Sequence, residues 1–233
     1  MNWKLTGSLL WTQQKSSMQV NLIAHTPDPE RTIVEVARVS SSRKDKTKDY
    51  AGLVRYLAKH AHWSPFEHAT FTFEIETSKA IGIQLIRHRS FSFQEFSQRY
   101  QDVNQMQNMF EPIELRKQCE DNRQSSSEVF NPELRPGFRA SELVDHVLNA
   151  TQHAYDELIK AGVAREQARF ILPLCTSTKI HMTGNVRSWI HFLELRDDAH
   201  AQLEIQLVAK EIKRILTGYL PTVAEALNWK PNE

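Results

Sequence analysis

The sequence contains few cysteines and glycines, and this scarcity excludes several kinds of site. Cys119 and Cys175 are too few for a disulfide framework or a cysteine-rich metal centre. Seven glycines form neither a G-x-G-x-x-G nor a G-x-x-x-x-G-K motif, which argues against a Rossmann or P-loop nucleotide site. A nucleotide bound by this chain is therefore expected to be held in another way.

Long hydrophobic runs and an excess of one charge are also missing. No apolar stretch approaches the roughly 18 residues of a membrane helix, and residues 1–20 lack the apolar core of a secretory signal, so we expect a cytoplasmic protein. The 29 basic and 28 acidic residues leave a net charge of +1, so no global field attracts nucleic acid or an anionic membrane. Any anion site must arise from local clustering.

Hydrophobic periodicity predicts a helix-rich chain with few strands. Strands are expected at residues 18–24 and 69–77, where apolar and polar positions alternate. Helices are expected at 32–38, 50–62, 78–86, from 141 up to Gly162, near 185–195, from 198 up to Gly218, and at 221–227. Residues 101–137 are polar and contain three prolines, which indicates an irregular connection with at most a short helix.

The order of these segments predicts the fold class. A regular alternation of strand and helix is not present, which favours α+β. We expect a helix-rich single domain over residues 1–233, with a core at about 18–217 and a small, mostly antiparallel sheet. A length of 233 residues is sufficient to bury such a core.

The densest cluster of chemically useful side chains lies in residues 87–100. This segment contains three arginines, a histidine, three serines and a glutamate, interleaved with phenylalanines. Arginine offers a planar fork of donors that can hold a phosphate or the oxygen edge of a pyrimidine, and aromatic rings offer stacking surface. The segment is a candidate pocket for an anion and a ring. The alternative is a solvated basic helix end, where the helix dipole favours arginines.

The same segment resembles the R-H-R-x7-S signature of the flavin-dependent thymidylate synthases. Arg87, His88 and Arg89 are followed after seven residues by Ser97. Other segments resemble the family in the same order, and the matches span about residues 60–205. These segments are residues 60–68, 71–73, 165–173, 185–188, 192–196 and 200–205.

The resemblance implies a reductive methylation. dUMP is methylated at carbon 5 of its ring, with methylene-tetrahydrofolate as carbon donor and FAD, reduced by NADPH, as hydride source. The implied assembly is a homotetramer whose sites are shared between subunits, and neither nucleic acid nor membrane is an expected partner. Such chemistry needs anion clamps but no cysteine nucleophile, and Cys175 lies in an apolar run where packing is favoured over reactivity.

Carried over position by position, the resemblance implies a set of dUMP contacts. Arg196 is the expected catalytic residue, because in the family this arginine faces the uracil and favours ionisation at nitrogen 3. A guanidinium suits this role since it stays protonated and stabilises negative charge on the activated ring. Ser97 is expected to bind and not to attack, because no His–Asp pattern around it would activate its hydroxyl. The implied dUMP contacts are Gln84, Arg87, Glu95, Ser97, Gln98, Arg99, Arg169 and Arg196.

The resemblance also implies a set of flavin contacts. Arg87 and Glu95 belong to both sets because the family builds each site from more than one subunit. The chain departs from the family pattern at Gln94, where Asn is frequent, and His191 stands where the family has Asn or His. The implied FAD contacts are His62, Ser64, Arg87, His88, Arg89, Glu95, Asn185, Arg187 and His191.

Three phenylalanines, Phe91, Phe93 and Phe96, make the signature segment unusually aromatic. They can stack on folate or pack an interface, and packing is favoured.

Two alternatives come from other chemistries. Imidazole and carboxylate groups at His60, His62, Glu67 and His68 are possible metal ligands. On one helix His60 and His62 would point about 200° apart, so we expect no metal site. The second alternative is a nucleic-acid-binding module, in which arginines of residues 87–100 contact phosphates and phenylalanines stack on bases. The near-zero net charge weakens that hypothesis.

Overall fold

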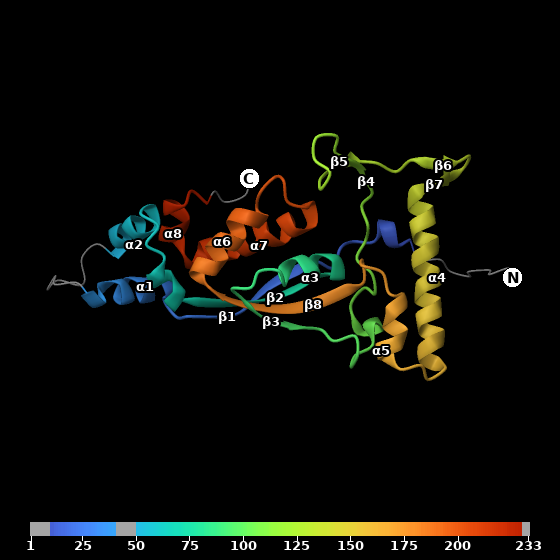
Figure 1. The fold of residues 1–233 in the computed structure, drawn as a ribbon, viewed down its shortest axis with the longest axis horizontal. Coiled ribbons are helices and arrows are strands. Elements are labelled where there is room, and N and C mark those ends of the chain that lie inside the picture. Colours follow the sequence, from blue (N-terminus) through green and yellow to red (C-terminus); the bar gives the residue numbers. More distant parts are fainter. Residues whose placement is uncertain (1–9, 41–49, 230–233) are drawn as a thin grey trace. The chain divides into compact units, whose positions relative to one another are not determined.

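The structure is a computed structural model that describes residues 10–40 and 50–229 (Figure 1). The described chain forms two compact units. The first unit contains residues 10–18, 76–83 and 95–179. The second contains residues 19–40, 50–75, 84–94 and 180–229. The single domain expected over residues 1–233 stays a prediction.

The described chain contains α-helices, short 3-10 helices and strands. The α-helices are α1 (Pro29–Ala37), α2 (Tyr50–Lys59), α3 (Lys79–Leu85), α4 (Ala140–Lys160), α5 (Arg165–Ala168), α6 (Val186–Arg196), α7 (Leu203–Tyr219) and α8 (Pro221–Ala226). The 3-10 helices are η1 (Trp11–Gln13), η2 (Arg38–Ser40), η3 (Ser64–His68), η4 (Val103–Gln105) and η5 (Arg169–Ile171). The strands are β1 (Gln19–His25), β2 (Thr70–Ser78), β3 (Ser92–Glu95), β4 (Arg116–Gln118), β5 (Ser126–Val129), β6 (Glu133–Arg135), β7 (Phe138–Arg139) and β8 (Ser177–Asn185).

Four strands form the main sheet, in the order β1-β2-β8-β3. Thr72 is hydrogen-bonded to Thr183, and Glu74 lies opposite His181 at 3.4 Å. Because residue numbers rise on β2 as they fall on β8, these two strands are antiparallel. Two further pairs, β4 with β5 and β6 with β7, are also antiparallel. The α+β class is therefore confirmed.

The second unit has its core between the sheet and helices α6 and α7. On β2, Phe71, Phe73 and Ile75 are fully buried, which is why the alternation of residues 69–77 correctly predicted a strand. Helix α7 packs against β1 and against α6 (Figure 1). Trp189 and Phe192 of α6 are fully buried in this core.

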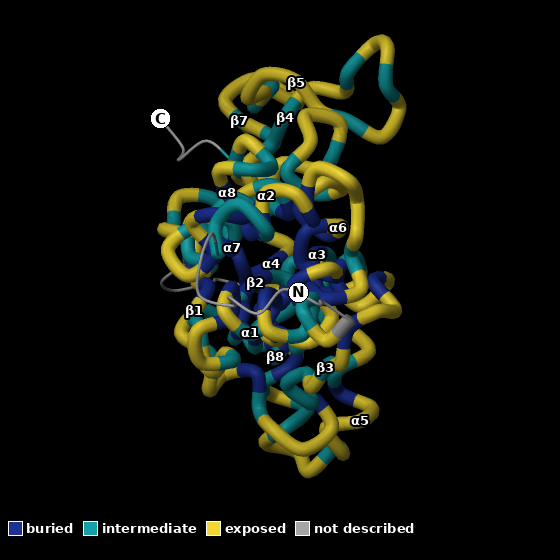
Figure 2. Tube along the Cα trace, turned by 90° about the vertical axis from the view of Figure 1, so that its left-hand side faces the viewer, coloured by how far each residue is buried: buried dark blue, intermediate teal, exposed yellow. Residues whose placement is uncertain are grey.

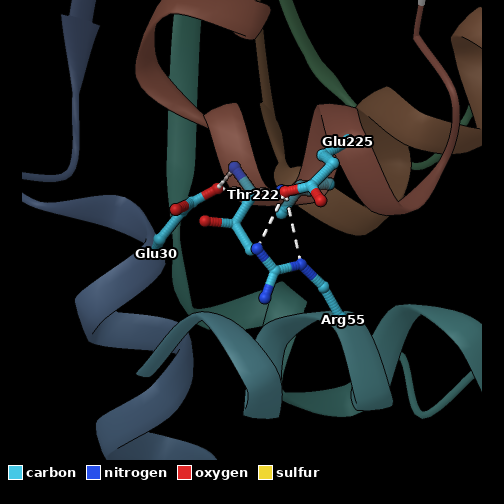
Figure 3. Close-up of polar contacts among 5 residues, drawn as sticks. Glu30, Arg55, Thr222 and Glu225 are labelled. Carbon is cyan, nitrogen blue, oxygen red and sulfur yellow. Dashed lines mark hydrogen bonds and ion pairs between the residues drawn. The ribbon is translucent and has the colours of Figure 1, made fainter. Parts of the chain in front are cut away.

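Buried and exposed polar contacts join α1, α2 and α8 in the second unit (Figure 3). Glu30 is only 4% exposed, and its Oε1 accepts hydrogen bonds from the backbone N–H groups of Thr222 at 2.7 Å and Val223 at 2.9 Å. This carboxylate satisfies two of the unpaired donors at the start of α8. Arg55 forms an ion pair with Glu225 at 2.9 Å on the surface.

The first unit is organised by the long helix α4. Trp11, Phe110, Leu148 and Tyr155 are buried together in its core. Phe96 of the signature segment packs against the same cluster. Phe96 thus packs within its own unit, and the interface packing that was favoured for it stays a prediction.

Several predicted boundaries differ from the structure for local reasons. Helix α2 ends at Lys59 and not at His62, because Ala61 adopts a left-handed backbone with φ of 53° and His62 N–H bonds back to Leu57 at 2.9 Å. The prediction for residues 101–137 was wrong in part. This region contains β4, β5 and β6, which are almost wholly exposed. Figure 2 shows the exposed chain around β5. Within the described ranges, no helix combines the length and apolar character needed to span a membrane.

Candidate functional site

The signature residues Arg87, His88 and Arg89 lie in turns that follow helix α3 in the second unit. The backbone N–H of Arg87 bonds to Gln84 O at 3.3 Å, and that of His88 bonds to Leu85 O at 3.1 Å. The N–H of Phe91 then bonds to His88 O at 3.2 Å before β3 begins. These turns leave Arg87 and Arg89 exposed, while the His88 side chain between them is buried.

His88 contacts Arg196, the expected catalytic residue. Arg196 is the last residue of α6, and its Nε donates a hydrogen bond of 2.9 Å to His88 Nε2. The two residues are 108 positions apart in the sequence. The structure thus brings two sequence-predicted site residues into direct contact.

The environment of His88 favours its neutral form. Burial, followed by the positive charge of Arg196, lowers its pKa to about 4. Phe192 and Phe91 lie edge-on to the imidazole, with ring centroids at 4.9 and 6.3 Å. At neutral pH this histidine therefore adds no charge beside Arg196.

The charge of Arg196 is not neutralised by the adjacent acid. Asp197 forms an ion pair with Lys213 at 2.8 Å. Among the described residues, the bond to His88 is the one hydrogen bond recorded for the Arg196 side chain, and no ion pair is recorded for it. Partial burial lowers the pKa of Arg196 from its usual value. Its Nη groups are consequently available to a ligand.

Phe91 packs inside the second unit, which differs from the interface packing that was favoured for it. It is 9% exposed and lies edge-on to Trp189 with ring centroids 4.6 Å apart. Its ring also lies against Gly184 of β8. The signature segment is therefore attached to the core through an aromatic side chain.

A cavity of about 520 Å³ lies in the second unit. Three sequence-predicted flavin residues, Asn185, Arg187 and His191, line it. The other lining residues are Trp63, Glu67, Ser90, Ser188, Ile190 and Glu194. Predicted residues His62, Ser64 and Arg89 are sequence neighbours of Trp63 or Ser90 and are exposed.

The start of helix α6 forms part of this cavity. Asn185 is its N-cap, and Asn185 Oδ1 accepts a hydrogen bond from Ser188 N at 2.9 Å. The helix dipole adds partial positive charge at this end, which favours an anion. Arg187 forms an ion pair with Glu67 across the cavity lining. Arg87 and Arg89, by contrast, have no side-chain partner recorded among the residues that the structure describes.

The remaining predicted residue of the second unit is Gln84. Its Nε2 donates a hydrogen bond of 2.7 Å to Gln202 Oε1. A ligand at Gln84 would compete with this contact.

The other predicted substrate residues lie in the first unit. Glu95 Oε1 is 2.7 Å from Lys79 Nζ and accepts a hydrogen bond from Thr178 Oγ1 at 2.8 Å. Lys79 compensates the charge of Glu95 and fixes its carboxylate. Lys79 was not predicted as a partner of Glu95, because the contact depends on the turn between α3 and β3.

The predicted substrate residues after Glu95 carry hydrogen-bond donors, some of them buried and others exposed. Gln98 is 9% exposed, and its Nε2 is buried without a hydrogen-bond partner in the described structure. Such a donor costs free energy unless a ligand or water satisfies it. Arg99 lies 3.6 Å from Glu166, and the Arg169 guanidinium lies 6.0 Å from the ring of Phe170. Ser97 is partly buried, and its carbonyl accepts from Tyr100 and Gln101 N–H groups at 3.0 Å.

The expected lack of a cysteine nucleophile agrees with the surroundings of Cys175. Burial raises its pKa to about 11, so the thiolate is scarce at neutral pH. Within residues 10–40 and 50–229, no group of three or more His, Cys, Asp or Glu side chains is arranged to hold a metal ion.

Comparison with known proteins gives a consistent result over most of the chain. Residues 21–222 match the family model described as thymidylate synthase complementing protein. The chain is 40% identical over 201 residues to a flavin-dependent thymidylate synthase of Synechocystis sp., a match that covers 86% of this chain and 90% of the relative. A probable flavin-dependent thymidylate synthase of Paramecium bursaria Chlorella virus 1 is also 40% identical, with 86% and 91% covered. A flavin-dependent thymidylate synthase of Thermosipho africanus is 37% identical, with 83% of each chain covered.

Proposed function

Because the chain belongs to the family of flavin-dependent thymidylate synthases, we propose that it converts dUMP to dTMP with methylene-tetrahydrofolate as carbon donor. NADPH is the proposed reductant and FAD the proposed cofactor. The observation that carries the proposal is the Arg196–His88 pair. It presents a partly buried guanidinium that has no carboxylate partner among the described residues, at the position to which the resemblance assigns the uracil-facing arginine.

The residues of the second unit fit a flavin dinucleotide. The 520 Å³ cavity combines the apolar surface of Trp63 and Ile190 with polar groups of Asn185 and Ser188. Pockets of this size and mixed lining are typical for cofactors. The start of α6 suits a diphosphate, and the exposed Arg87 and Arg89 add positive charge. When bound and reduced by NADPH, FAD would supply the hydride that completes the methyl group.

Arg196 acts on the pyrimidine in this proposal. Its Nη groups donate hydrogen bonds to the ring oxygens and stabilise the negative charge that develops as the ring is activated. It stays protonated despite partial burial, since a guanidinium has a very high intrinsic pKa. No cysteine nucleophile takes part, in keeping with the raised pKa of Cys175.

The proposal assigns the nucleotide's remaining contacts to the other residues that the resemblance implies. Arg87, Arg99 and Arg169 are the proposed phosphate ligands, since arginine forks match phosphate oxygens. Gln98 is a proposed donor to the substrate, which would satisfy its unpaired Nε2. Glu95 and Ser97 contribute acceptor and hydroxyl groups. A homotetramer with shared sites, as the resemblance implies, is the proposed assembly.

The experiment begins with the purified protein and its absorbance in the flavin region. We expect a yellow protein that NADPH bleaches, and dTMP formation that requires dUMP and methylene-tetrahydrofolate together. A colourless protein that binds oligonucleotides in a salt-sensitive manner would instead support the nucleic-acid-binding module. Omitting each reactant in turn is the control.

A further inference from the structure

We propose that His88 is a positioning residue that holds the Arg196 guanidinium through its neutral imidazole. This inference deepens the proposed function and rests on it. It assigns to His88 a role different from the flavin contact that the family resemblance implies. The contact between His88 Nε2 and Arg196 Nε at 2.9 Å is its starting point.

The chemistry of arginine determines which imidazole nitrogen carries the proton. Arginine has only donors, so the Arg196 Nε–H must donate and His88 Nε2 must accept. The neutral ring therefore carries its proton on Nδ1. A doubly protonated imidazole has no acceptor and would lose this hydrogen bond.

A neutral partner orients Arg196 without reducing its charge. The guanidinium is planar, so a bond at Nε also sets the plane of both Nη groups. A carboxylate in the same place would orient it as well, but would neutralise the charge that the activated uracil needs. The local carboxylates have other partners: Asp197 pairs with Lys213 at 2.8 Å, and Glu194 lies 3.8 Å from His191.

The imidazole is itself held in place by the core. Phe192 and Phe91 lie edge-on to it, and the His88 backbone bonds to Leu85 O. The charged and titratable groups that act on the ring are Arg196 and His191, and both disfavour its protonated form. Among the described residues that line the 520 Å³ cavity, His88 is absent. The surrounding rings thus fix the imidazole beside Arg196.

Two substitutions test whether His88 acts by accepting a hydrogen bond from Arg196 or only by filling space. His88→Gln keeps an acceptor for Arg196 Nε, whereas His88→Leu fills the site without one. We expect His88→Leu to lower kcat by about 100-fold, because a displaced catalytic group costs roughly that much. In the positioning role His88 contacts neither ligand, so the KM for dUMP and the flavin occupancy should change by less than about threefold. His88→Gln should recover most of kcat, and His146→Leu on the exposed face of α4 is the matched control.

Flavin occupancy decides between the two roles of His88. If His88→Leu and His88→Gln both release flavin, the residue is a flavin ligand and the positioning role is wrong. If His88→Leu keeps the wild-type kcat, the role is likewise refuted. Failure of the wild-type protein to form dTMP would refute the proposed function itself and is measured first.

A spectroscopic measurement tests the tautomer without turnover. Histidine-selective nitrogen-15 labelling, with the His88 signal assigned by its loss in His88→Gln, reports which ring nitrogen is protonated. We expect an unprotonated Nε2 at neutral pH, and a change of its shift in Arg196→Met. A protonated Nε2 would contradict the proposal.

Discussion

The ring of Phe91 occupies the space that a side chain at Gly184 would need. A Cβ atom on Gly184 would lie 2.3 Å from Phe91 Cδ1 and 2.4 Å from Cε1, far inside van der Waals contact. The glycine of β8 therefore permits the signature segment to pack directly on the sheet. Because the His88 backbone carbonyl accepts from Phe91 N–H, this close approach also determines where His88 lies.

Gly184→Ala should destabilise the protein for this reason. The ring of Phe91 would have to move against Trp189 and Phe192, and overpacking of this kind costs about 1–3 kcal/mol. Urea unfolding measures the change. Gly218→Ala is the matched control, since nothing lies within 4 Å of its added methyl group and alanine is the better helix former. Equal effects of the two substitutions would show that the Phe91 contact is unimportant.

Glu30 and Glu225 should differ sharply in their contributions to stability (Figure 3). Glu30→Ala leaves the buried N–H groups of Thr222 and Val223 without their acceptor, which should cost about 2 kcal/mol. Glu225→Gln removes only the exposed ion pair with Arg55, which should cost less than about 1 kcal/mol. Thermal and urea unfolding of both variants compare the two. A larger loss from Glu225→Gln would contradict the burial argument.

The core elements could be predicted from the sequence where one face of an element is apolar. β2 is such a case, because Phe71, Phe73 and Ile75 alternate with polar residues. β8 was not predicted, although its residues alternate in burial, because Ser177 and Thr178 are buried polar residues and Gly184 interrupts the apolar pattern. β4 and β5 have no buried face, so hydrophobic alternation contains no signal for them.

In the candidate site, contacts between residues far apart in the sequence were likewise not predictable from periodicity. The resemblance identified Arg196 and His88 separately, but no periodicity connects residues 108 positions apart. The pairing of Asp197 with Lys213, which leaves Arg196 without an acidic partner in the described part of the chain, also depends on the packing of α6 against α7. Asn185 was predictable as a helix start, since Asn is a favoured N-cap, and Ser188 N–H confirms it.

The pH dependence of stability should contain a contribution from His88. Its folded-state pKa of about 4 lies below the ordinary 6.5, so the unfolded chain binds the proton first as pH falls. The stabilisation is complete above about pH 6.5 and is lost as pH decreases toward 4. Between about pH 7.5 and pH 5, His88 should account for a loss of at most about 2 kcal/mol. Urea unfolding of wild type and His88→Gln at both pH values measures it, and a variant with the wild-type pH slope would refute the expectation.

Substitutions of Arg196 and Arg89 should have different effects, the first on catalysis and the second on flavin binding. Arg196→Ala removes the guanidinium that the proposal places at the uracil, so dTMP formation should fall by at least about a thousandfold while the flavin absorbance of the purified protein stays. Arg89→Ala removes an exposed charge that has no side-chain partner among the described residues and lies beside Ser90 of the cavity, and it should release FAD without unfolding the chain. Arg214→Ala is the control for a lost surface arginine, because Arg214 pairs locally with Glu211 at 2.6 Å on α7. Turnover and flavin absorbance are measured independently. Retained turnover in Arg196→Ala would therefore refute the catalytic role of Arg196. Unchanged flavin occupancy in Arg89→Ala would remove Arg89 from the cofactor site, and neither result would decide the other.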